Sequence, residues 1–256
     1  MNDKPNYKTW IRMNKLITII IITLFFIIIA LLPINIYIRI ISAVFALPFL
    51  YMMVILSSSY YQFAPFGGNY QSKIHDLIVS NLKAQEKGKI LDIGSGSGSL
   101  IIKLAKAFPN AAFIGIDYWG DNWEYSKKQC EENAKIEGVS DKIGFQKASA
   151  SKLPFEDSLF DSAVSCLTFH EVKDEKDKVK IIKEALRVIK PGGSFVFLDL
   201  FMDNKIYGEY ADLVKSVKEL GVKEIDLIKL RDEMKLPFLL LHKRVLGNAM
   251  IVTGIK

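Results

Sequence analysis

The fold of this chain is decided by Lys89-Ile90-Leu91-Asp92-Ile93-Gly94-Ser95-Gly96-Ser97-Gly98-Ser99-Leu100. The pattern predicts a short buried strand, a glycine-rich turn and the start of a helix. Three glycines at alternate positions allow a tight turn and let a ligand approach the main chain closely. The unpaired N–H groups at the start of the helix favour polar or anionic ligand groups. The stretch therefore predicts a loop of the nucleotide-binding type.

An acidic residue, Asp117, ends the next apolar run, Phe113–Asp117. Its carboxylate is placed to accept two hydrogen bonds from the hydroxyls of a ribose. Dinucleotides and S-adenosylmethionine are both bound by this layout. The spacing G-x-G-x-G departs from the dinucleotide fingerprint G-x-G-x-x-G, although a small residue at Ser99 keeps that alternative open. A glycine turn that binds no ligand is the third alternative.

The apolar residues of this 256-residue chain are concentrated near its N-terminus. Residues 16–32 carry no charge, and a second apolar run follows Pro33 and extends to Leu56. A helix needs about 20 apolar residues to span a bilayer. We therefore expect residues 1–56 to hold a transmembrane helical hairpin that turns near Pro33–Asn35. A single re-entrant or interfacial segment is the alternative.

The distribution of charge predicts how such a hairpin is oriented. Lys4, Lys8, Arg12 and Lys15 precede the first apolar run, whereas the turn offers only Arg39. The positive-inside rule places the N-terminus in the cytoplasm, and two spans return the chain to that side. We therefore expect a two-span membrane protein whose remaining residues, beyond the hairpin, form a cytoplasmic domain.

The remainder of the chain is nearly balanced in charge, because residues 1–56 hold five Lys or Arg against one Asp and so carry most of the net charge of +6. The sequence therefore gives no reason to expect a nucleic-acid partner. Cys130 and Cys166 are too few for a disulfide framework. The three His and two Cys show no ligand spacing, so we predict no metal site.

An aromatic segment, residues 57–75, follows the apolar runs and holds Tyr60, Tyr61, Phe63, Phe66 and Tyr70. It is broken by proline and glycine, so we expect a linker. Aromatic residues are enriched at membrane interfaces, which is one interpretation. A lid between the membrane and the cofactor cleft is the other.

Strands and helices alternate over residues 76–256. The pattern predicts helices over 72–86, 98–107, 121–137, 175–189 and 207–220. It predicts strands over 89–93, 112–117, 143–148, 160–167, 194–200, 222–230 and 249–255. We expect an α/β fold with a Rossmann-like, doubly wound seven-stranded sheet of five parallel strands and a closing antiparallel pair. Such sheets bind ligands at the carboxyl ends of their strands.

Five motifs occur in order along this domain: Leu91–Gly98, Asp117, the helix end Asn133-Ala134-x-x-x-Gly138, Leu153–Asp161 and Ala185–Gly193. Together they resemble the class I S-adenosylmethionine-dependent methyltransferases of the methyltransferase-11 or quinone-biosynthesis type. The resemblance covers about residues 70–256. Dinucleotide enzymes have no reason to carry the last three motifs, so the resemblance favours S-adenosylmethionine as the cofactor.

The resemblance implies a set of cofactor-binding residues: Asp92, Gly94, Ser95, Gly96, Gly98, Asp117, Tyr118, Ser149 and Ala150. The glycines would line the methionine part of the cofactor, Asp92 would hold its amino group, and Asp117 would bind the ribose hydroxyls. Tyr118 or Trp119 would lie against the adenine, with plain packing as the alternative for both. Ser149 stands where the family usually has an acid for the adenine amino group, so that contact loses its charge assistance.

Methyl transfer from a sulfonium is an in-line displacement, in which alignment supplies most of the catalysis. A general base matters where the acceptor carries a proton of high pKa. His170 and Glu171 follow the fourth predicted strand and are the candidate catalytic residues. The alternative for His170 is a structural role at a helix cap or in the cleft wall, and Asp199 is an alternative acceptor contact.

We therefore expect a membrane-anchored methyltransferase that acts on a small-molecule acceptor, and our specific hypothesis is a lipid-like acceptor resident in the membrane. One alternative is a methyltransferase of a soluble molecule with the hairpin as a mere anchor. The other is a cofactor-binding scaffold without catalytic activity.

Overall fold

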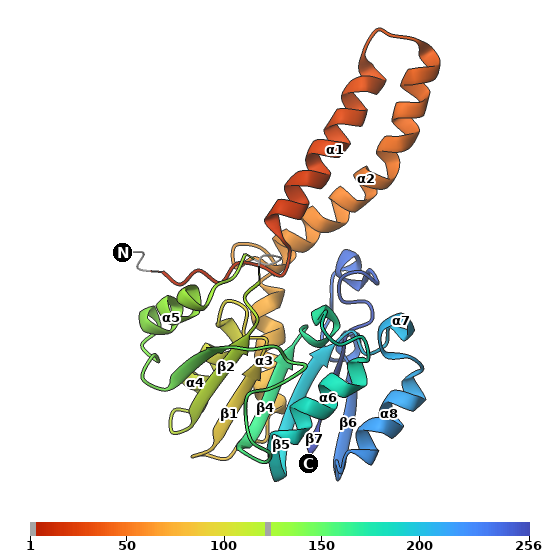
Figure 1. Cartoon of the computed structure of the whole chain (residues 1–256). Helices are drawn as coiled ribbons and strands as arrows, with labels where there is room; N and C mark the ends of the chain where they lie inside the picture. The colour runs from red at the N-terminus through yellow and green to blue at the C-terminus, as the bar shows by residue number, and fades with distance from the viewer. Residues whose placement is uncertain (1–3, 121–123) are drawn as a thin grey trace.

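Within the described residues, 4–120 and 124–256 of a computed structural model, seven strands form one sheet in the order β3-β2-β1-β4-β5-β7-β6 (Figure 1). The strands are β1 (Lys89–Ile93), β2 (Ala112–Asp117), β3 (Ile143–Lys147), β4 (Phe160–Cys166), β5 (Ile189–Asp199), β6 (Glu224–Lys229) and β7 (Met250–Ile255). Strands β1 to β5 are parallel, and β7 runs antiparallel between β5 and β6. This confirms the predicted α/β fold with its closing antiparallel pair.

Helices cover both faces of the sheet. They are α3 (Tyr70–Asn81), α4 (Ser99–Ala107), α5 (Lys127–Ile136), α6 (Lys178–Arg187), α7 (Asn204–Tyr207), α8 (Tyr210–Glu219) and α9 (Leu230–Glu233), with the short 3₁₀ helices η1 (Phe169–Glu171) and η2 (Phe238–Leu241). Successive strand residues face opposite layers, so Ile90 belongs to the core shared with α3 and α4, and Leu91 to the core shared with α6. Burial on both faces of the sheet explains why the central strands are mostly apolar.

Several boundaries differ from those predicted. The helix expected over 121–137 begins at Lys127, because Ser126 caps it by accepting a hydrogen bond from the Gln129 N–H at 3.2 Å; residues 121–123 lie outside the described residues. The helix expected over 207–220 begins only at Tyr210, because Gly208, with a φ of +72°, separates α8 from the short helix α7. The helix expected over 72–86 ends at Asn81.

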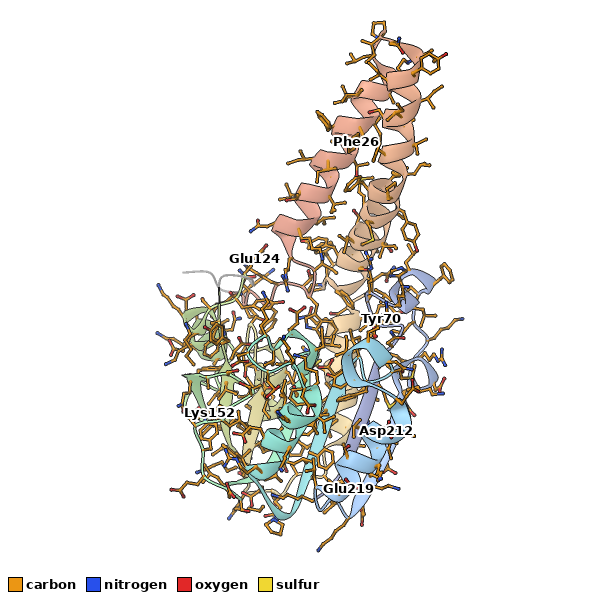
Figure 2. The ribbon with its side chains drawn as sticks, turned by 45° about the vertical axis from the view of Figure 1, so that its right-hand side comes forward. Phe26, Tyr70, Glu124, Lys152, Asp212 and Glu219 are labelled. Carbon is orange, nitrogen blue, oxygen red and sulfur yellow. The ribbon has the colours of Figure 1, made fainter. Side chains whose placement is uncertain are left out.

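Two apolar helices, α1 (Met13–Leu31) and α2 (Ile36–Phe63), form a hairpin that projects from one end of the sheet (Figure 1). At the turn, the side chain of Asn35 accepts a hydrogen bond from the Tyr37 N–H at 2.9 Å and caps α2. Phe26, labelled in Figure 2, stacks between the helices against Phe45 and Phe49, with centroid distances of 5.8 Å to each.

The second helix is longer than a bilayer requires. Its 28 residues extend about 42 Å, against a hydrocarbon thickness of about 30 Å. Its last turns bury Ile55, Ser59 and Phe63. The aromatic segment expected to be a linker over 57–75 is therefore helical as far as Phe63, and residues 64–69 alone connect α2 to α3.

Both hairpin helices are long and apolar enough to cross a membrane. Only 11% of the most apolar window of α1 and 22% of that of α2 is buried. The core helix of a soluble protein would be mostly buried, whereas these helices present an apolar surface to their surroundings.

We predict that Phe197→Ala destabilises the sheet domain by about 3–5 kcal/mol, because it removes a fully buried ring from the core. The Phe197 ring lies 5.2 Å from that of Phe169 and 5.0 Å from that of Phe195, measured between centroids. Thermal unfolding of the full chain in detergent tests this. The matched control is Phe238→Ala, whose ring is 85% exposed, and an equal loss in both variants would contradict the prediction.

Candidate active site

The glycine turn after β1 is held between its two neighbouring strands. The N–H groups of Gly94 and Ser95 donate to the Ile116 carbonyl of β2, at 2.8 and 2.9 Å. On the other side, a Cβ added at Gly94 would lie 1.9 Å from the Thr168 hydroxyl oxygen, and the φ of Gly94 is +83°. No residue with a side chain fits this position, because both the space and the backbone conformation exclude it.

Asp117 ends β2 and is anchored to the same turn. One carboxylate oxygen accepts from the Gly96 N–H at 2.9 Å, and the other accepts from the Trp119 N–H at 2.8 Å. Burial raises the pKa of Asp117, and these hydrogen bonds counteract that rise. A carboxylate offers about four acceptor positions, so two remain for a ligand such as a ribose.

A cavity of about 380 Å³ opens at the carboxyl ends of β1, β2 and β4, within the usual range for ligand pockets. Many of its walls come from the loops that follow these strands. They include Gly94, Ser95, Gly96, Ser97, Asp117, Tyr118, Ser149, Ala150, Leu167, Thr168, Glu171 and Asp174. Most of the residues predicted to bind the cofactor are thus brought together around one space.

Two of the predicted cofactor residues, Asp92 and Gly98, are not part of the cavity wall. Gly98 instead precedes α4, with Cys130 behind it. Trp119 is also outside the wall: its indole N–H donates to the Gly96 carbonyl at 2.9 Å, so it supports the turn from behind. Tyr118 does line the cavity and is 65% exposed, with the Lys147 ammonium 5.3 Å from its ring centroid.

Asp92 is buried beneath the turn, and neither of its carboxylate oxygens has a hydrogen-bond partner among the described residues. Burial raises its pKa to about 7 and the charge of Asp117 adds to the rise, while the nearby Ser95 hydroxyl, which donates to the Asp92 backbone carbonyl at 3.2 Å, lowers it. An unpaired buried carboxylate is costly, so the site is suited to a cation. The ammonium group of S-adenosylmethionine fits that requirement.

An N-terminal segment, residues 4–12, leads into α1 at the end of the sheet where the cavity opens (Figure 1). Trp10 lines the cavity, and its ring packs edge-on against those of Phe63 and His75, at 5.0 and 5.5 Å between centroids. The Tyr125 hydroxyl donates to the Thr9 carbonyl at 2.8 Å. Figure 2 shows Glu124 at the base of α1, where it accepts a hydrogen bond from the Asn14 N–H at 3.1 Å.

The contribution of this segment was missed from the sequence, because an isolated Trp before an apolar run has no periodicity that marks it. Gln71 and His75 of α3 also line the cavity. Neither was named from the sequence, although both lie within the segment 57–75, for which a lid at the cofactor cleft was one of the two expectations. Burial and the charge of Lys103 lower the pKa of His75 to about 3, so this imidazole is neutral at physiological pH. The Gln71 side-chain oxygen is buried with no hydrogen-bond partner in the described part of the chain.

A carboxylate does lie beside Ser149, although it comes from a different loop. The Ser149 hydroxyl lies 2.9 Å from that of Ser151, which donates to Asp174 at 2.7 Å, and Asp174 lines the cavity. Burial raises the pKa of Asp174, but the hydrogen bonds from Ser151 and Ser149 outweigh it and hold the pKa below its usual value. Asp174 follows η1 rather than β3, so no motif pointed to it.

His170, Glu171 and Asp199 form one cluster. The His170 Nδ1 lies 2.6 Å from the fully buried carboxylate of Asp199, which also accepts from the Phe169 and Leu200 N–H groups. Burial lowers the pKa of His170, but the charge and hydrogen bond of Asp199 raise it by more. Glu171 accepts from the Arg12 guanidinium at 2.9 Å. The candidate catalytic residues His170 and Glu171 therefore lie in one group with Asp199, and His170 contacts both carboxylates.

This cluster faces a second cavity, of about 210 Å³, which His170 lines while it does not line the first. Trp10, Leu167 and Glu171 line both cavities. These three residues therefore form a wall that is common to the two cavities.

Comparison with known proteins identifies a methyltransferase domain in this chain. Residues 91–197 match the family described as "Methyltransferase domain". A ubiquinone/menaquinone biosynthesis C-methyltransferase of Geotalea daltonii is 31% identical over 124 residues, which are 48% of this chain and 50% of that protein. A sterol 4-C-methyltransferase of Caenorhabditis elegans is 30% identical over 154 residues, 54% of this chain and 43% of that protein. The chain spans about half the length of the curated relatives it matches.

Solved structures share the fold. Geranyl diphosphate C-methyltransferase from Streptomyces coelicolor A3(2), solved with Mg²⁺, geranyl diphosphate and S-adenosyl-L-homocysteine, superimposes with a TM-score of 0.55 at 12% identity. The match covers 72% of this chain and 79% of that one.

We predict that Asp92→Asn stabilises the apoprotein while it weakens S-adenosylmethionine binding. The pKa of Asp92 is about 7 in the folded chain against an ordinary 3.8, so the ionised form destabilises the fold. The stability gained by the variant should grow from pH 4 to pH 7, to about 4 kcal/mol at most, and then stay constant. Thermal unfolding across pH and calorimetric titration of the cofactor measure the two effects.

The matched control is Asp226→Asn, which neutralises an exposed carboxylate on β6. It should change neither quantity. A loss of stability in Asp92→Asn at pH 8 would contradict the cost assigned to the buried carboxylate. Cofactor binding as tight as that of the unsubstituted chain would contradict the assignment of Asp92 to the ammonium group.

We predict that Asp174 accepts a hydrogen bond from the adenine amino group. Asp174→Asn should weaken S-adenosylhomocysteine binding about tenfold, as expected for a lost charge-assisted hydrogen bond. S-inosylhomocysteine lacks the amino group, so its affinity should change little. Asp141→Asn, an exposed substitution near β3, is the control. An equal loss for both ligands would contradict the assignment.

Proposed function

We propose that this chain, which carries a class I S-adenosylmethionine-dependent methyltransferase domain and takes S-adenosylmethionine as its cofactor, is a membrane-anchored enzyme that methylates a small molecule resident in the membrane. The proposal depends most on one observation. The cofactor cavity lies at the end of the sheet from which the apolar hairpin projects, and Trp10, just before α1, forms part of its wall (Figure 1). The reacting methyl group would therefore face the membrane side of the domain.

The cofactor roles follow from the geometry of the turn. S-adenosylmethionine supplies a methyl group on a positively charged sulfur, which is already a good leaving group. Asp92 would hold the ammonium, the Gly94–Gly96 backbone would follow the methionine part, and Asp117 would bind the ribose with its remaining acceptor positions. Asp174 would bind the adenine amino group in place of the acid that Ser149 replaces.

The chemical step would be governed by alignment across the wall between the two cavities. Asp199 would orient His170 by accepting a hydrogen bond from its Nδ1–H at 2.6 Å. The unprotonated nitrogen would then be Nε2, which lies 3.8 Å from the Glu171 carboxylate, and His170 lines the second cavity. It would remove a proton from an acceptor that carries one. Glu171, paired with Arg12, would complete the wall on the cofactor side.

Anchoring in the membrane is supported by the hairpin itself. Most of its side chains are exposed, and large residues such as Ile21, Phe25 and Val44 are 58–60% accessible. Surfaces of this kind are stable in a bilayer rather than in water. Lys4, Lys8, Arg12 and Lys15 precede the first span, so the positive-inside rule favours a cytoplasmic domain.

The full chain is the appropriate protein for a test, because a truncation at residue 57 would also remove Trp10 from the walls of both cavities and Ile11 and Arg12 from that of the second. We propose to incubate the chain in nanodiscs with S-adenosylmethionine labelled at the methyl group. Total lipid extract and water-soluble extract from the producing cells would be offered as separate acceptor pools.

We expect label in the lipid pool, and at least a tenfold loss of labelling in Asp117→Ala. Label confined to the water-soluble pool would assign a soluble acceptor and leave the hairpin as an anchor. Cofactor binding without labelling of either pool would favour a scaffold without catalytic activity.

A further inference from the structure

The second cavity lies at the base of the hairpin, between the N-terminal segment, the end of α2, η1 and the loop that precedes β7. Its walls are mostly apolar. They comprise Trp10, Ile11, Leu56, Phe63, Leu167, Leu200, Val245 and Leu246, together with Arg12, Lys15, His170, Glu171 and Arg244. A ligand that fills this space must therefore combine an apolar body with a group that suits the charged residues.

The charge of the wall is positive. Arg12, Lys15 and Arg244 contribute cations, and Glu171 is the one carboxylate among the lining residues. Glu171 is bound by Arg12 at 2.9 Å, so these two charges offset each other. Lys15 and Arg244 are exposed, and neither forms an ion pair with any carboxylate in the described part of the chain. Two uncompensated cations thus border an apolar cavity.

The position of these cations relative to α2 indicates how a ligand would enter. The Arg244 guanidinium lies 3.6 Å from the Met52 sulfur, and the His242 ring lies 5.9 Å from that of Tyr51, so the loop that carries Arg244 rests against α2. Below this contact, Leu56 and Phe63 of α2 form part of the cavity wall. An apolar chain could follow α2 out of the cavity while a polar end group stays beside the cations.

We propose that the second cavity is the acceptor site and that the acceptor is an amphiphile with an anionic group, which Lys15 and Arg244 bind. This inference rests on the proposed function and adds the chemical class of its substrate. The anionic group, a phosphate or a carboxylate, would be fixed at the mouth of the cavity. The apolar body would lie between α2 and Leu167, with its methyl-accepting atom near His170 and the wall shared with the cofactor cavity.

Equilibrium binding of labelled probes to the full chain in phosphatidylcholine nanodiscs tests the proposal, with empty nanodiscs subtracted. Dodecyl phosphate, dodecanol and inorganic phosphate separate the contributions of the anionic group and the apolar body. We expect dodecyl phosphate to bind at least tenfold more tightly than either of the other probes. Equal binding of dodecanol would show that the cations are not used, and equal binding of inorganic phosphate would show a site for free anions. Either result would overturn the proposal.

Lys15→Gln and Arg244→Gln should each weaken dodecyl phosphate binding about tenfold. Lys243→Gln is the matched control, because Lys243 is exposed next to Arg244 but does not line the cavity. It should change binding less than twofold. An equal effect of Lys243→Gln would indicate general attraction of anionic lipids to a basic surface, and the proposal would be wrong.

S-adenosylmethionine binding is measured in the same samples and should be unchanged by these substitutions. The charge-preserving variants Lys15→Arg and Arg244→Lys should retain dodecyl phosphate binding, and their failure to do so would overturn the role of charge. If the unsubstituted chain bound dodecyl phosphate but no S-adenosylmethionine, the proposed function would fail while the anionic amphiphile site would stand.

Discussion

The close approach of Gly94 to Thr168 is the constraint on which the rest of the site depends. It brings the turn after β1 against the loop after β4, while the N–H groups of Gly94 and Ser95 bind the Ile116 carbonyl of β2. The turn is thereby fixed between its two neighbouring strands. Asp117 accepts a hydrogen bond from the Gly96 N–H of the same turn. The carboxylate that we propose to bind the ribose is therefore positioned by the backbone of the turn.

Two buried carboxylates of the site, Asp92 and Asp199, differ in how their charge is stabilised. The Asp92 carboxylate has no hydrogen-bond partner among the described residues, and burial raises its pKa to about 7. Its ionised form therefore destabilises the apoprotein, and a bound cation would offset that cost. Asp199 shows the opposite arrangement, since it is fully buried but bound by His170 and three backbone N–H groups. Asp199, whose hydrogen bonds are made, thus orients His170, whereas Asp92, whose carboxylate has no partner among the described residues, is suited to bind a cationic ligand.

The sequence was most informative where structure is determined locally. The alternation of apolar strands and amphipathic helices predicted the sheet and its closing antiparallel pair, because each strand carries its own burial pattern. It failed for residues whose role depends on contacts far along the chain. The Trp10 ring packs against those of Phe63 and His75, which lie far along the chain, and Asp174 accepts a hydrogen bond from Ser151 of another loop. Such contacts leave no periodic pattern in the sequence. A glycine motif is different, because its residues determine the backbone conformation of the turn in which they lie.

The N-terminal segment joins the proposed membrane anchor to the proposed active site, since it lines both cavities and continues directly into α1. The central claim is that the glycine turn and Asp117 bind S-adenosylmethionine. Calorimetric titration of the full chain in nanodiscs with S-adenosylmethionine and with NADH tests it most directly, with Asp117→Ala beside the exposed control Asp141→Ala. We predict saturable binding of S-adenosylmethionine that Asp117→Ala weakens and the control leaves unchanged. Absence of that binding, or a preference for NADH, would contradict it.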